Sequence, residues 1–301
     1  MTITQVGFIG LGNMGAPMAA HLVEAGFALT VSDAAPGVTE RFVAEHPTAV
    51  AAAGPQSFAA VQALILMLPT SDIVEDVLER EQVAAALPPG CLVIDMSSSE
   101  PLRTRTLAAR LRAKGLAMLD APVSGGVRGA RAARLSVLVG GSEADLAQAT
   151  PLLTAMAKTV IRVGDIGSGH AAKALNNLVS AATMSITVEA VAVAQAFGIT
   201  PGTMTQVLNS SSGRSNTSES KLAQFMTNGS FNSGFSLQLM AKDVGLALGL
   251  ARALDRPAEL AGHAADQWRR IAGQVSPATD HTQLYTLLGA TVEPQPQGGE
   301  A

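Results

Sequence analysis

The sequence predicts an α/β domain built on a parallel sheet, followed by an all-α domain. Apolar runs of strand length alternate with helical stretches up to Gly164, as in a sheet covered by helices on both faces. From Gly167 onward the pattern is almost entirely helical. We therefore expect a first domain at residues 1–164, a second at 165–292, and a disordered polar tail at 293–301.

Composition excludes several classes of function. Hydrophobic residues make up 48% of the 301 residues, and the net charge is −4, so no basic surface invites nucleic acid or anionic membrane. The single cysteine, Cys91, excludes an internal disulfide framework and fits a reducing cytoplasm. The N-terminus resembles no leader peptide, and the charge-free segment that starts at Pro47 is broken by Gly54-Pro55. We expect a soluble, cytoplasmic protein, and the scattered histidines predict no metal site.

The first strand-like run, residues 5–9, leads directly into a glycine-rich turn and then a helical stretch at 16–25. Strand, G-x-G-x-x-G and helix in this order indicate a Rossmann-like dinucleotide-binding unit, whose helix N-terminus holds the pyrophosphate. A glycine turn without that context would be weak evidence. The predicted cofactor contacts in this turn are Gly10, Leu11, Gly12, Asn13, Met14 and Gly15.

The second predicted strand, residues 28–32, ends at Asp33. This aspartate lies 18 residues beyond Gly15, where an acidic side chain can bind the hydroxyls of the adenosine ribose. Its charge would repel a 2′-phosphate, and no Arg or Lys follows before Arg41. The sequence therefore favours NAD over NADP, with NADP possible. The alternative is a turn-forming aspartate at a strand end.

Three later apolar runs, at 61–68, 91–96 and 116–120, each stop in small, polar or proline residues. Ligands of open α/β sheets bind at the carboxyl ends of the strands, so we expect the loops that follow these runs to line a site. Two further strands are predicted at 135–139 and 159–163. Helices are predicted at 102–114 and near 143–153, and in the second half of the chain at 171–197, 204–208, 237–254 and 259–272.

The long predicted helix at 171–197 opens after the glycine-broken turn at 167–169. Lys173 and Asn177 lie four residues apart and therefore share one helical face. A lysine and an amide on an otherwise apolar helix suit proton transfer. A free lysine has a pKa of about 10.4. Burial and a positively charged nicotinamide ring would lower this pKa toward the range of a general base, whereas a substrate carboxylate would raise it. The alternative is a solvated lysine near a helix start.

Four motifs, in order and spread over most of the chain, resemble the β-hydroxyacid dehydrogenases, the family typified by 3-hydroxyisobutyrate dehydrogenase and tartronate semialdehyde reductase. They are Gly7-Phe-Ile-Gly-Leu-Gly-Asn-Met-Gly15, Asp120-Ala-Pro-Val-Ser-Gly-Gly126, Gly167-x-Gly169-x-x-x-Lys173-x-x-Asn176-Asn177 and Phe235-x-x-x-Leu-Met-x-Lys242-Asp243. The resemblance implies a Rossmann-like domain, a long interdomain helix and an all-helical domain that forms homodimers or homotetramers. It also implies the interconversion of a short 3-hydroxy acid and its semialdehyde or keto form.

The same resemblance implies a role for individual residues. Lys173 is implied as the general acid/base and Asn177 as its assistant. Ser124, Gly125, Gly126 and Lys242 are implied as substrate contacts, and Met67, Leu68, Pro69, Ser98 and Lys242 as cofactor contacts. Where the family usually has Gly-Thr, this chain has Ala133-Arg134, which leaves the conformation of that loop open.

The substrate stays open at this stage. 3-Hydroxyisobutyrate is the default, and glycerate or tartronate semialdehyde, serine, D-threonine-type amino acids and sulfolactaldehyde are alternatives. The polar loop at 209–218 differs among members of the family, and its Arg214 either binds a second acidic group or is solvated. Two other classes remain: an imine reductase, whose members generally lack the lysine, and a non-catalytic NAD-binding module. The intact lysine and asparagine favour neither.

Overall fold

The computed structural model describes residues 3–292. The chain divides into two compact units, Met1–Lys173 and Ala174–Ala301. The division falls inside one continuous helix, α8 (Ser168–Phe197), which the sequence predicted as a long helix. The domain boundary expected after Gly164 stays a prediction, and the expected tail at 293–301 lies outside the described residues.

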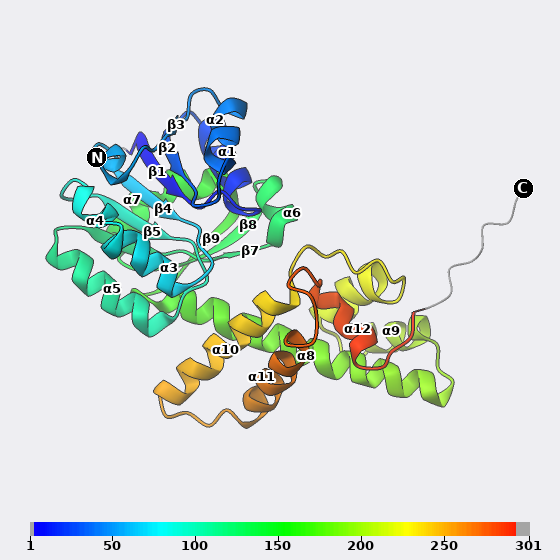
Figure 1. The fold of residues 1–301 in the computed structure, drawn as a ribbon. Helices are drawn as coiled ribbons and strands as arrows, with labels where there is room; N and C mark the ends of the chain where they lie inside the picture. Colours follow the sequence, from blue (N-terminus) through cyan, green and yellow to red (C-terminus); the bar gives the residue numbers. More distant parts are fainter. Residues whose placement is uncertain (1–2, 293–301) are drawn as a thin grey trace, which may run out of the picture. The chain divides into compact units, whose positions relative to one another are not determined.

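The first unit is an α/β fold built on a nine-stranded sheet within the described residues (Figure 1). Its strands are β1 (Gln5–Ile9), β2 (Ala28–Ser32), β3 (Val50–Ala51), β4 (Ala63–Leu66), β5 (Leu92–Asp95), β6 (Ala117–Asp120), β7 (Val123–Ser124), β8 (Leu135–Gly140) and β9 (Ala157–Gly164). They lie in the order β3-β2-β1-β4-β5-β6-β8-β7, and β9 pairs with β8.

The strands from β3 to β6 are all parallel, which confirms the parallel sheet predicted from the continuous apolar runs. Strand β8 runs antiparallel to β6 and β7, and parallel to β9. From β1 the chain moves outward to β2 and β3 and then returns to β4 on the other side of β1. This reversal between β1 and β4 is the topological switch point at which such sheets bind ligands.

Helices cover both faces of this sheet. They are α1 (Gly15–Glu24), α2 (Val38–Glu45), η1 (Pro55–Phe58), α3 (Ser71–Glu75), η2 (Asp76–Arg80), α4 (Val83–Ala86), α5 (Pro101–Ala113), α6 (Gly126–Arg131) and α7 (Glu143–Met156). Alternate strand residues enter opposite cores because successive side chains point to opposite faces. Ile65 packs in the core that contains Met18 of α1 and Leu152 of α7, whereas Leu64 packs in the core that contains Leu107 of α5.

The second unit is all-helical, as predicted. Beyond the body of α8 it contains α9 (Pro201–Asn209), the π-helix η3 (Thr217–Met226), α10 (Leu237–Ala253), α11 (Glu259–Ala272), η4 (His281–Gln283) and α12 (Leu284–Leu287). Its core includes Met184 of α8 and the fully buried Trp268 of α11. The Trp268 indole Nε1 donates to Ser185 Oγ over 3.1 Å, which satisfies its one polar atom inside this core.

Helix α8 is long and apolar enough to cross a membrane by length and composition, and 44% of its most apolar window is buried. Its buried side, which includes Ala181, Met184 and Val188, belongs to the core of the second unit. A second apolar row on the same helix is exposed to solvent. It consists of Val179, Ile186, Val193 and Phe197, each at least 61% exposed.

Candidate active site

The glycine-rich loop after β1 has the geometry of a pyrophosphate cradle. Gly10 has φ +101°, and a Cβ there would overlap the carbonyl oxygen of Met67. A Cβ at Gly15 would overlap the carbonyl oxygen of Gly10, so helix α1 approaches the strand closely only because of that glycine. At Gly12, by contrast, a Cβ would meet no atom within 4 Å. Open space in front of the start of α1, which has no side-chain cap, fits a bound pyrophosphate.

Asp33 stands at the carboxyl end of β2 and is tied to this loop. Its Oδ2 accepts from the Leu11 backbone N–H over 2.7 Å, and its Oδ1 accepts from the Ala35 N–H over 2.7 Å. The backbone N–H of Asp33 donates to Thr39 Oγ1 over 2.9 Å. These bonds fix the orientation of the carboxylate. Asp33 is only half-buried, so its carboxylate can also accept from a ribose hydroxyl.

The loops after β4 and β5 lie beside each other at the same edge of the sheet. The Leu68 N–H donates to Ser97 Oγ over 2.9 Å, and the neighbouring Met67 N–H donates to the Ile9 carbonyl over 2.9 Å. In the second loop Ser97 and Ser99 are buried, and both donate to the carboxylate of Asp95, Ser97 through its backbone N–H and Ser99 through its hydroxyl. Ser98, the predicted cofactor contact, is the one serine of the three that is partly exposed.

The loop after β6 contains the predicted carboxylate-binding residues. Ser124 ends the short strand β7, which pairs with β8, and Gly125 and Gly126 follow with φ +124° and +60°. These positive φ values favour glycine, and a turn without side chains leaves its backbone N–H groups unobstructed. A Cβ at Gly126 would meet no atom within 4 Å, so the space at this turn is open.

Asp120, at the end of β6, anchors the start of helix α8, and the sequence did not predict this contact. Its Oδ1 accepts from the Gly167 N–H over 2.6 Å, and its Oδ2 accepts from the His170 N–H over 2.8 Å. A Cβ at Gly169 would overlap the Leu138 carbonyl oxygen and lie 2.8 Å from the Asp120 carbonyl oxygen. Gly169 therefore lets the helix start directly against the sheet, whereas a Cβ at Gly167 would lie 2.7 Å from the Pro101 carbonyl oxygen of α5.

The first turns of α8 carry the predicted catalytic pair. Lys173 and Asn177 occupy successive turns of this continuous helix, and both are buried. The Asn177 amide donates from Nδ2 to Oδ2 of Asp243 on α10 over 2.6 Å. Asp243 is 2% exposed, and reasoning from the sequence gave it no role of its own, although it stands next to the predicted contact Lys242. Lys242 Nζ lies 3.7 Å from Asp243 Oδ1.

The polar loop at 209–218 is shorter than predicted, because η3 already begins at Thr217. Arg214 is exposed and its Nε lies 3.5 Å from Glu219 Oε1, so the structure gives it a surface ion pair. Lys221 of η3 is half-buried, and its Nζ donates to Ser180 Oγ over 3.4 Å. No sequence signal pointed to Lys221, because a lysine in a polar segment ordinarily faces solvent.

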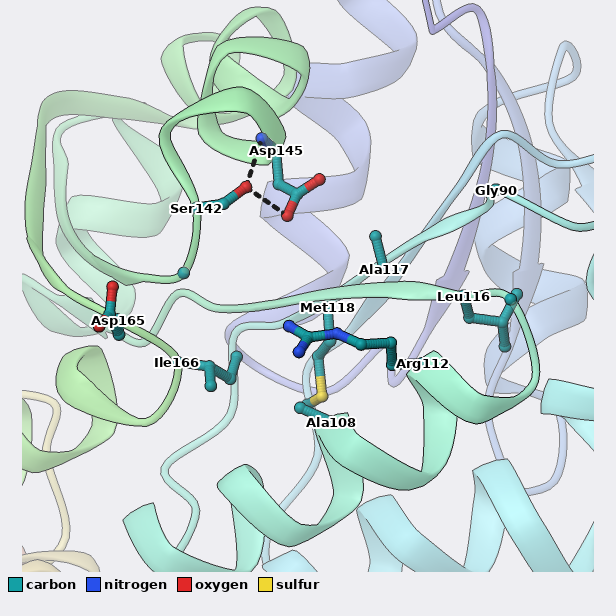
Figure 2. Close-up of a pocket in the computed structure, with 12 residues that line it drawn as sticks. Gly90, Ala108, Arg112, Leu116, Ala117, Met118, Ser142, Asp145, Asp165 and Ile166 are labelled. Carbon is teal, nitrogen blue, oxygen red and sulfur yellow. Dashed lines mark hydrogen bonds between the residues drawn. The ribbon is translucent and has the colours of Figure 1, made fainter.

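The first unit has a surface hollow (Figure 2). It is lined by the end of α5, the start of β6 and the N-terminus of α7, including Arg112, Met118 and Ser142. Ser142 and Asp145 cap α7 by bonding each other, with Ser142 Oγ donating to Asp145 Oδ2 over 2.6 Å. Asp165 and Ile166, just before α8, also line the hollow, and its lining includes none of the predicted site residues.

Comparison with known proteins agrees with this geometry. Residues 5–164 match the family described as the NAD binding domain of 6-phosphogluconate dehydrogenase. Residues 167–288 match the family described as NAD-binding of NADP-dependent 3-hydroxyisobutyrate dehydrogenase.

Individual relatives match over most of their length. The chain is 38% identical to 3-hydroxyisobutyrate dehydrogenase of Pseudomonas aeruginosa over 84% of this chain and 87% of that protein. It is 39% identical to 2-(hydroxymethyl)glutarate dehydrogenase of Eubacterium barkeri over 81% of each. The solved structure of 3-hydroxyisobutyrate dehydrogenase of Mycobacterium tuberculosis with L-serine superposes with a TM-score of 0.89 and 35% identity, covering 96% of this chain and 100% of that one. The chain therefore belongs to the β-hydroxyacid dehydrogenase family of oxidoreductases, which use a nicotinamide dinucleotide as cofactor.

Proposed function

We propose that the protein is an NAD-dependent dehydrogenase that interconverts a short 3-hydroxy acid and its semialdehyde, with 3-hydroxyisobutyrate as the reference substrate. The observation that carries the proposal is the buried Lys173, which lies on a helix that Asp120 fixes to the carboxyl edge of the sheet. That edge also carries the open glycine-rich loop. Family membership and the names of the relatives support the reaction class.

Each residue has a distinct part in the proposed mechanism. The bound nicotinamide supplies hydride acceptance in the forward direction and hydride donation in the reverse. The neutral Lys173 amine removes the hydroxyl proton as the carbonyl forms, and the ammonium returns that proton to the carbonyl oxygen during reduction. Asn177 holds the substrate oxygen, with Asp243 fixing its amide. Ser124, Gly125 and Gly126 bind the substrate carboxylate, and Lys242 lies beside cofactor and substrate.

Asp33 supports NAD rather than NADP as the preferred cofactor. Its carboxylate stands at the end of β2 with two backbone N–H groups holding its oxygens. A 2′-phosphate at the same place would be repelled by that charge, whereas two ribose hydroxyls can donate to it. In this proposal Gly10 to Gly15, Met67 to Pro69 and Ser98 contact the rest of the dinucleotide.

We also propose a soluble, cytoplasmic homodimer or homotetramer. The exposed apolar row on α8 extends from Val179 to Phe197, which is roughly 27 Å at the rise of an α-helix. An apolar row of this length is a typical subunit interface, and burial there would cover the part of α8 that its own unit leaves open. Light scattering on the purified protein tests it, because a monomer at micromolar concentration would contradict the proposal.

The reaction itself is tested with a panel of hydroxy acids, using NAD and NADP in parallel and following the nicotinamide absorbance. The panel contains 3-hydroxyisobutyrate, glycerate, serine and D-threonine, and cyclic imines are offered with the reduced cofactors. We expect reduction of NAD with 3-hydroxy acids. A preference for imines would favour the reductase class, and cofactor binding without turnover would favour a non-catalytic binding module.

A further inference from the structure

Two buried carboxylates lie side by side at the carboxyl edge of the sheet. Asp95 ends β5 and Asp120 ends β6, and the two residues are register partners on these neighbouring parallel strands. Asp95 is 1% exposed and Asp120 is fully buried. Residues in register on adjacent strands point to the same face, so two acidic groups meet here away from water, which is costly unless other groups compensate them.

Asp95 organises the loop at 97–99, which we call the serine loop. Its Oδ1 accepts from the Ser97 N–H over 3.0 Å, and its Oδ2 accepts from Ser99 Oγ over 2.9 Å. These two bonds flank Ser98, the predicted cofactor contact. Ser97 Oγ also accepts from the Leu68 N–H over 2.9 Å, so the orientation of Asp95 affects both of the predicted cofactor loops that follow β4 and β5.

Asp120 organises the start of α8 instead. Its oxygens accept from the N–H groups of Gly167 and His170, over 2.6 and 2.8 Å. Lys173 follows His170 by three residues, so the two side chains share one face of the helix, roughly 4.5 Å apart along its axis. The carboxylate that fixes this first turn therefore also fixes the turn from which the proposed acid/base projects.

The imidazole of His170 lies between the two carboxylates. Its side chain is fully buried, with Nε2 at 3.7 Å from Asp95 Oδ2 and Nδ1 at 3.9 Å from Asp120 Oδ2. Nδ1 also lies 2.9 Å from Thr104 Oγ1 of α5, and this hydrogen bond orients the ring. One side chain of α8 thus faces both the acid that organises the serine loop and the acid that organises its own helix.

The surroundings of the ring indicate which atom faces Asp95. Among the described residues Nε2 has no hydrogen-bond partner, and the group it faces is the carboxylate of Asp95. A lone pair on Nε2 would repel that carboxylate, whereas an N–H is attracted to it, so we assign a hydrogen to Nε2. A shift of about 0.5 Å would bring this N–H within hydrogen-bond distance of Asp95.

We propose that His170 is a positioning residue that couples the serine loop to the turn of α8 that carries Lys173, through its Nε2 and the carboxylate of Asp95. The inference rests on the proposed function, in which Ser98 contacts the cofactor and Lys173 moves the proton. Through this link a cofactor that orders the serine loop also orders the base, so that hydride acceptor and base are held in one geometry. His170 acts through Asp95 rather than on the substrate.

The test compares two amides that each reproduce one end of the ring. In His170→Gln the side-chain amide reaches as far as Nε2, toward Asp95, whereas in His170→Asn it reaches only as far as Nδ1, beside Thr104. Both variants leave a polar amide in the same buried place, so a general disturbance of packing should affect them alike. The matched control is His263→Asn, which replaces an exposed histidine of α11.

Binding of NADH and NADPH is measured by fluorescence titration, and kcat and KM for the hydroxy acid are measured with the preferred cofactor. We expect His170→Asn to raise the dissociation constant of the reduced cofactor at least about fivefold and to lower kcat at least about tenfold, with a smaller change in KM. His170→Gln should restore most of both losses, and His263→Asn should match the wild type. Wild-type binding and turnover in His170→Asn, or equal losses in the two amide variants, overturn the inference.

A double-mutant cycle with Asp95→Asn separates this inference from the reaction itself, because it is measured on cofactor binding and needs no turnover. If His170 acts through Asp95, adding His170→Asn to Asp95→Asn should weaken binding by less than about twofold. Additive losses overturn the inference even if 3-hydroxyisobutyrate is oxidised, and a non-additive cycle supports it even if no hydroxy acid on the panel is a substrate. If His170→Asn does not fold, Thr104→Val takes its place in the cycle, since it removes only the hydroxyl that orients the ring.

Discussion

Asn177 and Asp243 join helices α8 and α10 through a hydrogen bond of 2.6 Å from the amide Nδ2 to the carboxylate Oδ2. The bond fixes which end of the amide faces Asp243, and the Asn177 Oδ1 accepts from Asn176 Nδ2 over 3.2 Å. Asp243 is buried, and its other oxygen, Oδ1, has no hydrogen-bond partner among the described residues. Oδ1 instead lies 3.7 Å from Lys242 Nζ, an ion pair. Because the short bond from Oδ2 goes to the Asn177 amide, we interpret Asp243 as a positioning residue for Asn177.

Replacing Asp243 by Asn should lower kcat by about ten- to a hundredfold, because an amide partner no longer dictates the orientation of the Asn177 amide. KM for the hydroxy acid should change less than kcat. The matched control is Asp266→Asn, which removes an exposed carboxylate of α11.

A double-mutant cycle separates positioning from loss of structure. Asn177→Ala and Asp243→Ala should each reduce kcat, and the double variant should be little worse than either one. Additive losses in kcat would contradict the coupling.

Lys173→Ala should lower kcat by about a hundred- to ten-thousandfold, the usual contribution of a general acid or base. The affinity for NADH should stay within about threefold, because Lys173 lies outside the glycine-rich loop and the Asp33 contacts. Steady-state kinetics and fluorescence titration with NADH measure the two quantities. Lys158→Ala is the control, and a Lys173→Ala variant that keeps most of its turnover would refute the proposed role.

Asp33→Asn should reduce the ratio of kcat/KM for NAD to that for NADP by at least tenfold. The substitution removes the charge that repels a 2′-phosphate but keeps an oxygen that can accept from Leu11 N–H. It therefore tests charge with less disturbance of the loop than alanine would cause. A wild type that already prefers NADP, or a ratio unaffected by the substitution, would contradict the assignment to NAD.

Much of this fold could be predicted because strong local patterns coincide with the elements. The buried strands β4, β5 and β6 are continuous apolar runs, and the turn around Gly10 has a fixed spacing of glycines. The antiparallel direction of β8 was not predictable, because direction depends on long-range pairing such as Asp120 with Gly140. Strand β7 has only two residues, too few to give a period.

The site was predictable where a residue has a motif around it and unpredictable where two distant segments meet. Lys173 and Asn177 could be found by helical spacing. Asp120 accepts hydrogen bonds from the start of α8, about 50 residues further along the chain, and no local sequence pattern predicts that role. The contact of Lys221 with Ser180 could not be predicted either, because it brings together two segments, η3 and α8, that share no sequence pattern.

Gly169→Ala should destabilise the protein by about 2 kcal/mol or more, because the new methyl group would overlap the Leu138 carbonyl oxygen, which a backbone cannot easily move. Gly249→Ala is a matched helical control on α10, where a Cβ would meet no atom within 4 Å. That control should be stabilising by up to about 1 kcal/mol, the ordinary difference in helix propensity. Urea denaturation measures both, and equal effects at the two sites would contradict the close approach.

Lys221→Met should stabilise the protein at neutral pH, and the gain should disappear in alkali. Burial lowers the pKa of Lys221 from 10.5 to about 8 in the folded protein. Between pH 8 and pH 10.5 Lys221 is protonated in the unfolded chain but largely neutral in the folded protein. The wild-type free energy of unfolding therefore rises with pH over this range. Below pH 8 the variant should be more stable by up to about 3 kcal/mol, the free energy that corresponds to the lowered pKa.

Urea denaturation of both proteins from pH 7 to about 10 measures this difference, with Lys158→Met as the pH-independent control. A difference between wild type and Lys221→Met that stays constant with pH would show that the lysine titrates normally, and a variant less stable than wild type at pH 7 would show that its ammonium is already well paired.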